Sequence, residues 1–223
     1  MEMNKIIHGE AIEEMKKLAD KSVDLILCDL PYGTTDCEWD KCLPMKELWA
    51  EYKRIIKRNG AILLFAQQPF ATDLINEGRK MFRYQIVWEK GRATGFLNAK
   101  RMPLRAHELI LVFYNKLPVY NPQFVPGKPY KSKASNMRST AIYRQHNKTA
   151  NINSGYRYPR DVVFFYISKE DGQYHPTQKP LGLLRFLIKS YSNPGDLVLD
   201  NCCGSGSTCV AAKQTERQYI GIE

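Results

Sequence analysis

The sequence predicts an α/β protein with a doubly wound, mostly parallel β-sheet. Short apolar runs alternate with segments of helical periodicity along most of the 223-residue chain. Two of these runs, Val23–Cys28 and Leu197–Leu199, end at an aspartate, and the second continues through glycines into a helix pattern. In such sheets, ligands bind at the carboxyl ends of the strands. A chain of this length supports one well-buried domain with an insertion.

The first half of the chain alternates between strand and helix patterns. Val23–Cys28 is interrupted only by Asp24 and predicts a buried strand. Leu43–Lys57 has apolar residues at helical spacing and stops before Asn59 and Gly60, which predicts a helix. The other expected elements are a strand at Ala61–Phe65, a helix from Pro69 to about Gly78, strands at Tyr84–Trp88 and Leu109–Tyr114, and a loop over Gly91–Pro103.

The last third of the chain returns to this alternation after a basic insertion. Leu181–Tyr191 predicts a helix, and Leu197–Leu199 predicts a strand ending at Asp200. Ser207–Lys213 predicts another helix, and Tyr219–Ile222 a final strand. We therefore expect a single domain over residues 1–223 with an inserted segment over residues 116–174.

Charge is distributed unevenly along the chain. The formal net charge is +10, and the stretch from Lys116 to Arg160 contains no Asp or Glu. A solvated loop would show the same charge pattern, but interleaved tyrosines, asparagines and glutamines favour a nucleic-acid surface, because aromatic and amide side chains stack on bases or read their edges. The expected DNA-binding residues are Lys128, Lys131, Lys133, Arg138, Arg144, Lys148, Arg157 and Arg160.

The sequence indicates neither an export signal nor a metal site. Charged residues interrupt Met1–Leu18, and the longest apolar run, Ala61–Ala66, is too short to cross a bilayer. We therefore expect a cytoplasmic protein whose six cysteines remain thiols. No Cys-x-x-Cys pair occurs, so we expect no metal.

Three segments carry chemical signals. Asp29-Leu30-Pro31-Tyr32 directly follows the first predicted strand, although an Asp before a Pro is also an ordinary turn. Asp200 leads through Gly204 and Gly206 into a helix, and Glu223 ends the next strand. This succession suits a nucleoside that carries positive charge, since two acids flank the turn and a P-loop lysine is absent. The third segment, His175–Pro180, opens the helix Leu181–Tyr191 and by itself indicates only a capping segment.

Together these segments resemble the amino-methylating DNA methyltransferases, which act on adenine N6 or cytosine N4. The first is similar to the family's Asp-Pro-Pro-Tyr motif, with Leu30 in place of the first Pro. The third is similar to the segment before the cofactor half. The second is similar to the Asp-Pro-Phe-x-Gly-Ser-Gly loop, with Asn201 and Cys202 in place of Pro and Phe. The order, with the catalytic motif first, is similar to the permuted β-type members.

The resemblance implies a Rossmann-like fold, S-adenosylmethionine as cofactor, double-stranded DNA as substrate, and direct transfer to a flipped base. It assigns catalysis to Asp29, Leu30, Pro31 and Tyr32, with the Asp29 carboxylate and the Leu30 carbonyl accepting hydrogen bonds from the amino group and Tyr32 stacking on the base. Glu10 would lie near the cofactor's adenine ring. The implied cofactor-binding residues are Glu10, His175, Thr177, Lys179, Asp200, Cys202, Gly204, Ser205, Gly206, Thr208 and Glu223.

Several interpretations stay open from the sequence. Adenine N6 is favoured as the target, cytosine N4 is the nearest alternative, and a catalytically silent DNA-binding module is a third possibility. The recognition sequence, a restriction partner and the oligomeric state, including a homodimer, are not determined by these residues.

Overall fold

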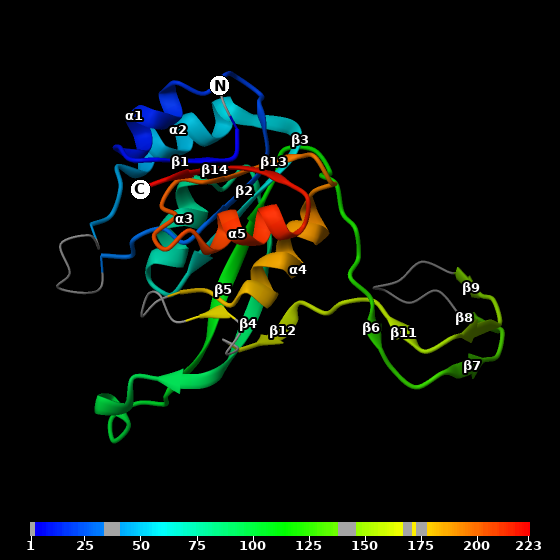
Figure 1. Cartoon of the computed structure of the whole chain (residues 1–223). Helices are drawn as coiled ribbons and strands as arrows, with labels where there is room; N and C mark the ends of the chain where they lie inside the picture. Colours follow the sequence, from blue (N-terminus) through cyan, green and yellow to red (C-terminus); the bar gives the residue numbers. More distant parts are fainter. Residues whose placement is uncertain (1–2, 34–40, 138–145, 167–170, 173–177) are drawn as a thin grey trace. The chain divides into compact units, whose positions relative to one another are not determined.

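The structure, a computed structural model, describes residues 3–33, 41–137, 146–166, 171–172 and 178–223 (Figure 1). The chain divides into two compact units, one of Met1–Asn121 with Asp161–Glu223 and one of Pro122–Arg160. The second unit is shorter than the 116–174 segment expected from charge, because β12 (Val162–Phe165) pairs with the main sheet. Within the described residues, we find no helix long and apolar enough to span a membrane.

An eight-stranded sheet forms the centre of the larger unit, in the order β1-β14-β13-β2-β3-β5-β4-β12. Among these strands, β5 runs antiparallel to β3 and β4, and the other neighbouring pairs are parallel. The prediction of a mostly parallel α/β sheet is therefore confirmed. Besides β12, the strands are β1 (Lys5–Ile7), β2 (Val23–Cys28), β3 (Ile56–Ala66), β4 (Phe82–Thr94), β5 (Arg105–Phe113), β13 (Leu197–Asp200) and β14 (Gln218–Ile222).

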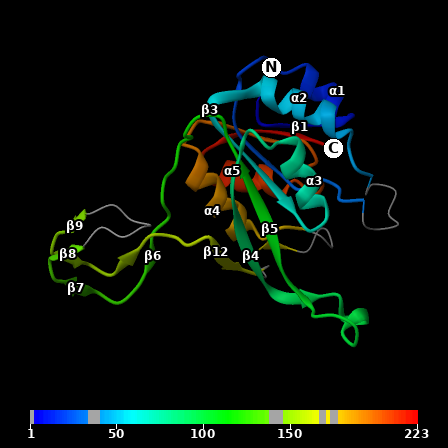
Figure 2. The same cartoon turned by 180° about the vertical axis from the view of Figure 1, so that it is seen from behind.

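Helices cover both faces of the sheet, as Figures 1 and 2 show from opposite sides. One core contains buried residues of α1 (Ala11–Lys16), α2 (Met45–Ile55) and α3 (Phe70–Glu77). The other core contains those of α4 (Leu181–Tyr191) and α5 (Ser207–Gln214). Alternate residues of each central strand enter opposite cores, because successive side chains of a strand point to opposite faces. The sheet is therefore buried on both faces, and its strand ends are where polar side chains gather.

Some elements differ from their predicted form. The segment Gly91–Pro103, expected to be a loop, belongs to a long hairpin in which β4 continues to Thr94 and a short 3₁₀ turn, η1 (Phe96–Asn98), precedes β5. Its exposed, mixed composition lacks the apolar run used to predict strands. The short elements β1 and α1 were not predicted, because charged residues interrupt their apolar pattern.

The smaller unit consists of paired short strands: β6 (Val125–Pro126) with β11 (Tyr156–Arg157), β7 (Tyr130–Ser132) with β10 (Asn151–Asn153), and β8 (Ser135–Met137) with β9 (His146–Lys148). Phe124 packs against Tyr158 with tilted rings whose centroids are 4.9 Å apart, yet both side chains are more than half exposed. Among the described part of this unit, no large apolar side chain is buried. The unit is therefore mostly surface.

Candidate active site

Four carboxylate side chains lie at the carboxyl ends of adjacent parallel strands. Glu10 follows β1, Glu223 follows β14, Asp200 ends β13 and Asp29 follows β2. The register pairs β1 with β14 and β13 with both β14 and β2, so these ends share one edge of the sheet. The Gly9 N–H donates to the Glu223 carbonyl at 3.0 Å, which joins the chain before Glu10 to the end of β14. The edge is therefore strongly acidic, as a site for a cationic ligand should be.

Asp29 is held by two donors. The Tyr32 hydroxyl donates to Asp29 Oδ1 at 2.8 Å, and Lys179 Nζ donates to Oδ2 at 2.5 Å. Burial raises the pKa of Tyr32 well above its usual value, and the charge of Asp29 adds to this effect, so the hydroxyl stays neutral. The Tyr32 ring lies 5.2 Å from the ring of Phe70 at the start of α3. Leu30 is buried, which fixes the backbone between Asp29 and Tyr32.

Lys179 belongs to a buried series of alternating charges that sequence reasoning did not find. Its Nζ lies 3.4 Å from Glu108 Oε2, and Lys90 Nζ donates to the other oxygen, Oε1, at 3.1 Å. The side chains of these three residues are at most 12% exposed. Burial alone would lower the pKa of Lys179, but Asp29 and Glu108 outweigh it and raise the pKa above the usual value. Lys179 therefore carries charge where it contacts Asp29.

Glu108, on β5, carries the negative charge between Lys179 and Lys90. Burial would raise its pKa, but the charges of Lys179 and Lys90 outweigh burial and lower it. Among the described residues, no group donates a hydrogen bond to its Oε2, which is paired with Lys179 by charge. The sequence signal that could have identified it is a single acid next to a fully apolar strand, His107-Glu108 before Leu109–Phe113.

Asp200 is 4% exposed, and burial raises its pKa from 3.8 to about 6. The Thr208 side chain, the Cys28 thiol and the Cys202 N–H bond to the carboxylate and oppose this shift. The charge of Asp29 raises the pKa further, so the two aspartates interact electrostatically across neighbouring strands. Asp200 is therefore a carboxylate that a cationic ligand would stabilise.

The turn after Asp200 requires glycine. Gly204 and Gly206 have φ angles of +50° and +76°, in the left-handed region that other residues rarely adopt. The Gly204 N–H donates to Glu223 Oε2 at 2.7 Å, and Gly206 precedes the first residue of α5. A Cβ built on Gly204 would meet no atom within 4 Å, so open space lies beside this turn. Ser205 is exposed in the same turn, and its hydroxyl lies 3.0 Å from that of Ser207.

Asn201 and Cys202, which replace the Pro and Phe of the similar family loop, contact different parts of the protein. The buried Tyr52 hydroxyl of α2 donates to Asn201 Oδ1 at 2.7 Å. The Cys202 N–H donates to Asp200 Oδ1 at 3.2 Å, and its side chain packs partly against the core. Asn201 therefore anchors the loop to α2, a contact that sequence reasoning did not predict because the two residues are far apart in the chain.

Lys179, which the resemblance assigns to the cofactor, forms ion pairs with Asp29 and Glu108, because the chain before α4 brings its ammonium to the end of β2. Its assignment to the cofactor stays a prediction. Of the other expected site residues, His175, Thr177, Arg138 and Arg144 lie outside the described residues.

The expected DNA-binding residues belong to the smaller unit. Lys128, Lys131, Lys133 and Arg160 are exposed, and Lys148 ends β9. The Arg157 guanidinium donates to Asn153 and to the Lys128 carbonyl and lies 4.7 Å from the centroid of the Tyr130 ring. Its expected contact with DNA stays a prediction, as do those of the exposed lysines.

Residues 23–223 match a family model, N6_N4_Mtase, described as DNA methylase. YhdJ of Escherichia coli, named a DNA adenine methyltransferase, is 30% identical over 100% of this chain and 79% of its own length. The type II methyltransferase M.HindIII of Haemophilus influenzae is 26% identical over 98% of this chain and 90% of its own. The crystal structure of an M1.HpyAVI–SAM complex has a TM-score of 0.66 and 27% identity, covering 98% and 92% of the two chains.

Proposed function

Because the chain belongs to the DNA methylase family of N6 and N4 methyltransferases, we propose that it transfers the methyl group of S-adenosylmethionine to the N6 amino group of adenine in duplex DNA. The observation that carries this proposal is the position of Asp29 beside the Asp200 loop on one sheet edge. Adenine is favoured because the motif begins with Asp and the relatives include a named adenine methyltransferase.

The residues of the loop fit a nucleoside sulfonium. Buried Asp200 would hold the positively charged methionine portion, since its carboxylate gains from a nearby cation. The open space beside Gly204 would let the cofactor approach the backbone closely, and the N–H groups at the start of α5 lie next to this turn. Exposed Glu223 would accept the ribose hydroxyls. When bound, the cofactor supplies an electrophilic methyl group attached to a good leaving group.

The Asp29 carboxylate and the Leu30 carbonyl would accept hydrogen bonds from the two N–H groups of the amino group. The lone pair of this nitrogen is delocalised into the base, and two acceptors fixed in place favour the geometry in which it can attack. An ionised carboxylate has about four lone-pair positions, so Asp29 retains acceptors beyond those used by Tyr32 and Lys179. Lys179 orients the carboxylate through its ion pair.

The base must leave the duplex to reach Asp29, because a stacked base cannot approach a strand end at the edge of a sheet. The half-buried Tyr32 presents its ring beside Asp29, where a flipped base can stack on it, and the buried Phe70 packs against that ring. Tyr32 has to exchange its packing on Phe70 for packing on the base or share its ring face between them.

The test is methyl incorporation into unmethylated plasmid DNA at saturating cofactor, with the methylated nucleoside identified by mass. Wild type should produce N6-methyladenine. Asp29→Ala should lower turnover about a hundredfold or more, about 2.7 kcal/mol, while calorimetric cofactor affinity stays nearly constant. Asp29→Asn keeps the side-chain volume beside Lys179 and separates the effect of charge from that of packing.

The control is Asp73→Ala, which removes an exposed aspartate of α3. Equal turnover of Asp29→Ala and this control would refute the catalytic assignment. N4-methylcytosine as product would establish the alternative target, and no incorporation by wild type would favour a silent DNA-binding module.

A further inference from the structure

The hairpin of residues 91–107, which we call the projecting hairpin, extends past the edge that carries Asp29. The register places the end of β2 level with the first residues of β4: Cys28 pairs with Leu64, which pairs with Leu111, which pairs with Gln85. β4 then continues to Thr94, about 30 Å of extended chain. Since β4 runs in the same direction as β2, it leaves the sheet on the side of Asp29.

The tip of the projecting hairpin exposes large apolar side chains. Phe96 is 80% exposed and Leu97 is 99% exposed, and Met102 and Leu104 are also exposed. Gly95 has a φ of +88°, and backbone hydrogen bonds from Asn98, Ala99, Arg101 and Met102 close successive turns behind it. An ordered tip that leaves Phe and Leu in water indicates a surface that is covered in a complex.

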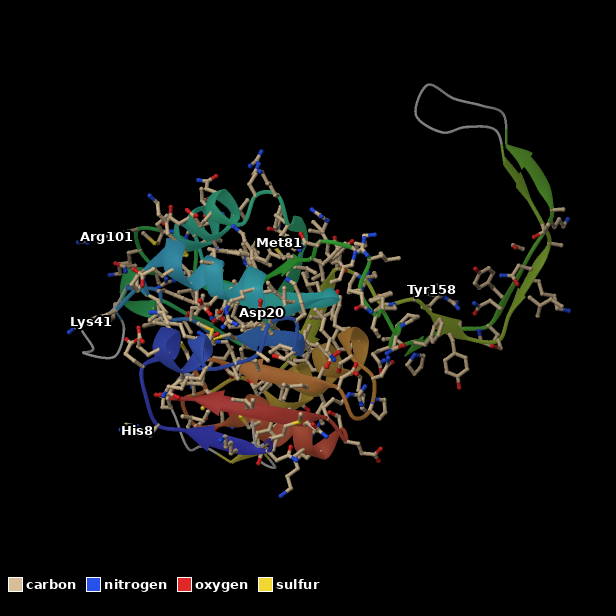
Figure 3. All side chains as sticks on the ribbon, turned by 90° about the horizontal axis from the view of Figure 1, so that it is seen from above. His8, Asp20, Lys41, Met81, Arg101 and Tyr158 are labelled. Carbon is tan, nitrogen blue, oxygen red and sulfur yellow. The ribbon has the colours of Figure 1, made fainter. Side chains whose placement is uncertain are left out.

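The projecting hairpin carries charge of one sign. From Lys90 to His107 the chain contains no Asp or Glu, although it contains five Lys and Arg residues. Lys90 pairs with Glu108, and Arg105 donates to Gln67 at 3.2 Å. The exposed Arg92, Lys100 and Arg101 form no ion pair with any described residue (Figure 3 labels Arg101). Their ammonium and guanidinium groups are available to a polyanion.

We propose that the projecting hairpin is a DNA-docking element in addition to the basic segment of residues 122–160. Arg92, Lys100 and Arg101 neutralise backbone phosphates, and Phe96 and Leu97 contact the bases as an apolar wedge. The proposal rests on the proposed function, because the catalytic edge and the hairpin would engage the same duplex.

Charge decides between DNA and a second copy of the chain. Association of two projecting hairpins would bring acid-free surfaces together and cost repulsion, whereas a duplex carries one phosphate charge per about 1.7 Å of helix axis. Apolar wedges of Phe and Leu are also typical of proteins that unstack a base step. Such unstacking would lower the cost of extracting a neighbouring base toward Asp29.

The first test measures phosphate neutralisation. Lys100→Gln with Arg101→Gln is compared with Arg79→Gln and Lys80→Gln, an exposed basic pair between α3 and β4 with the same change in charge. Binding to a random-sequence 30-bp duplex is followed by fluorescence anisotropy against salt. The hairpin pair should lower the slope of the log–log plot by about 0.9 for each phosphate that is no longer neutralised, and the control pair should leave it unchanged.

The second test measures the wedge. Phe96→Ala with Leu97→Ala should weaken duplex binding roughly tenfold or more and should abolish any preference for a duplex with one mismatch, because a mismatched step costs less to unstack. Phe96→Trp with Leu97→Met should retain both properties. Leu117→Ala, another exposed apolar position at 78%, serves as the matched control, and thermal melting verifies folding.

Three outcomes would overturn the proposal: salt slopes equal for both basic pairs, mismatch preference unchanged in Phe96→Ala with Leu97→Ala, or a wild-type dimer that this variant converts to monomer. Methylation by wild type keeps the two proposals distinguishable. If wild type methylates plasmid DNA and the hairpin variants have the same KM for DNA, the hairpin proposal fails and the proposed function stands. If the hairpin effects appear without methylation, the docking element stands and the proposed activity fails.

Discussion

Asp200 illustrates how one buried carboxylate couples ligand binding to pH. Its folded-state pKa of about 6 exceeds the ordinary value of 3.8, so the folded protein binds more protons than the unfolded chain between these values. Ionisation of Asp200 therefore costs stability, and this cost accumulates as pH rises from 3.8 to about 6 and is complete above that value. A cation bound beside the carboxylate compensates for that cost.

We expect the affinity for S-adenosylmethionine to fall as pH drops below about 6, because the ligand must then compete with a proton on Asp200. The limiting fall is about tenfold per pH unit. Calorimetry from pH 5 to 8 measures it, with Asp200→Asn as the comparison. That variant should bind weakly with little pH dependence, and parallel curves for the two proteins would contradict the role of Asp200.

Glu108 is predicted to act as a positioning residue through Lys179. Glu108→Gln removes a charge that raises the pKa of Lys179, so burial should lower that pKa and the alkaline limb of the activity profile should move to lower pH. We expect kcat to fall on the order of tenfold while the KM for cofactor is unchanged. Glu89→Gln, an exposed neighbour on β4, is the control. An unshifted pH profile would reduce Glu108 to a purely structural part.

Between elements, the Tyr52–Asn201 hydrogen bond joins α2 to the cofactor loop. Tyr52→Phe leaves the buried Asn201 oxygen without this donor and should lower the free energy of unfolding by about 1–3 kcal/mol. Cofactor affinity should fall as well, because the loop after Asp200 loses its hydrogen bond to α2. Urea unfolding and calorimetry check both effects.

The matched comparison for this prediction is Tyr191→Phe. Tyr191 on α4 is also buried and shares a 2.8 Å hydroxyl contact with Tyr84, away from the cofactor loop. This variant should be destabilised by a similar amount and retain cofactor affinity. An equal fall in affinity in both variants would show that Tyr52 acts only through general stability.

At the scale of the whole molecule, the two compact units differ in how far their side chains are buried. The larger unit has a core on each face of its sheet, whereas Phe124, Tyr130 and Tyr158 of the smaller one are exposed, as are Lys128 and Lys131. The strands of the smaller unit are only two or three residues long, and such short strand pairs have little stability of their own. Contact with a partner would therefore stabilise this unit.

Lys131→Gln with Lys133→Gln is therefore expected to lower the salt slope of DNA binding by up to about 1.8, at about 0.9 per neutralised phosphate. Both lysines are exposed in the smaller unit, so folding should be unaffected. Arg79→Gln with Lys80→Gln again controls for net charge. A slope that matches this control would leave the two lysines as solvent-exposed charges without a contact to DNA.

Sequence patterns among neighbouring residues were sufficient to predict many of the helices and strands. The helix Leu181–Tyr191 and the strand Val23–Cys28 have their predicted bounds, because an amphipathic spacing and a continuous apolar run are properties of neighbouring residues. The family and the reaction were likewise predicted from short motifs, and the matching family model confirms a DNA methylase. The predicted cofactor, S-adenosylmethionine, is supported by the similarity to the M1.HpyAVI–SAM complex. The individual site residues and the bounds of the inserted segment stay predictions.

The sequence by itself determined most of the strands and helices around the central sheet, that two acids follow strand ends, and that glycines occupy the turn before α5. Tertiary structure alone decided that Lys179 contacts Asp29 and Glu108, that Asn201 meets Tyr52, and that β12 completes the sheet. These contacts join residues distant along the chain, and their energies depend on burial that exists only once the sheet has formed. Periodicity records the local preference for an element, and it contains no information on which charge a folded chain brings beside another.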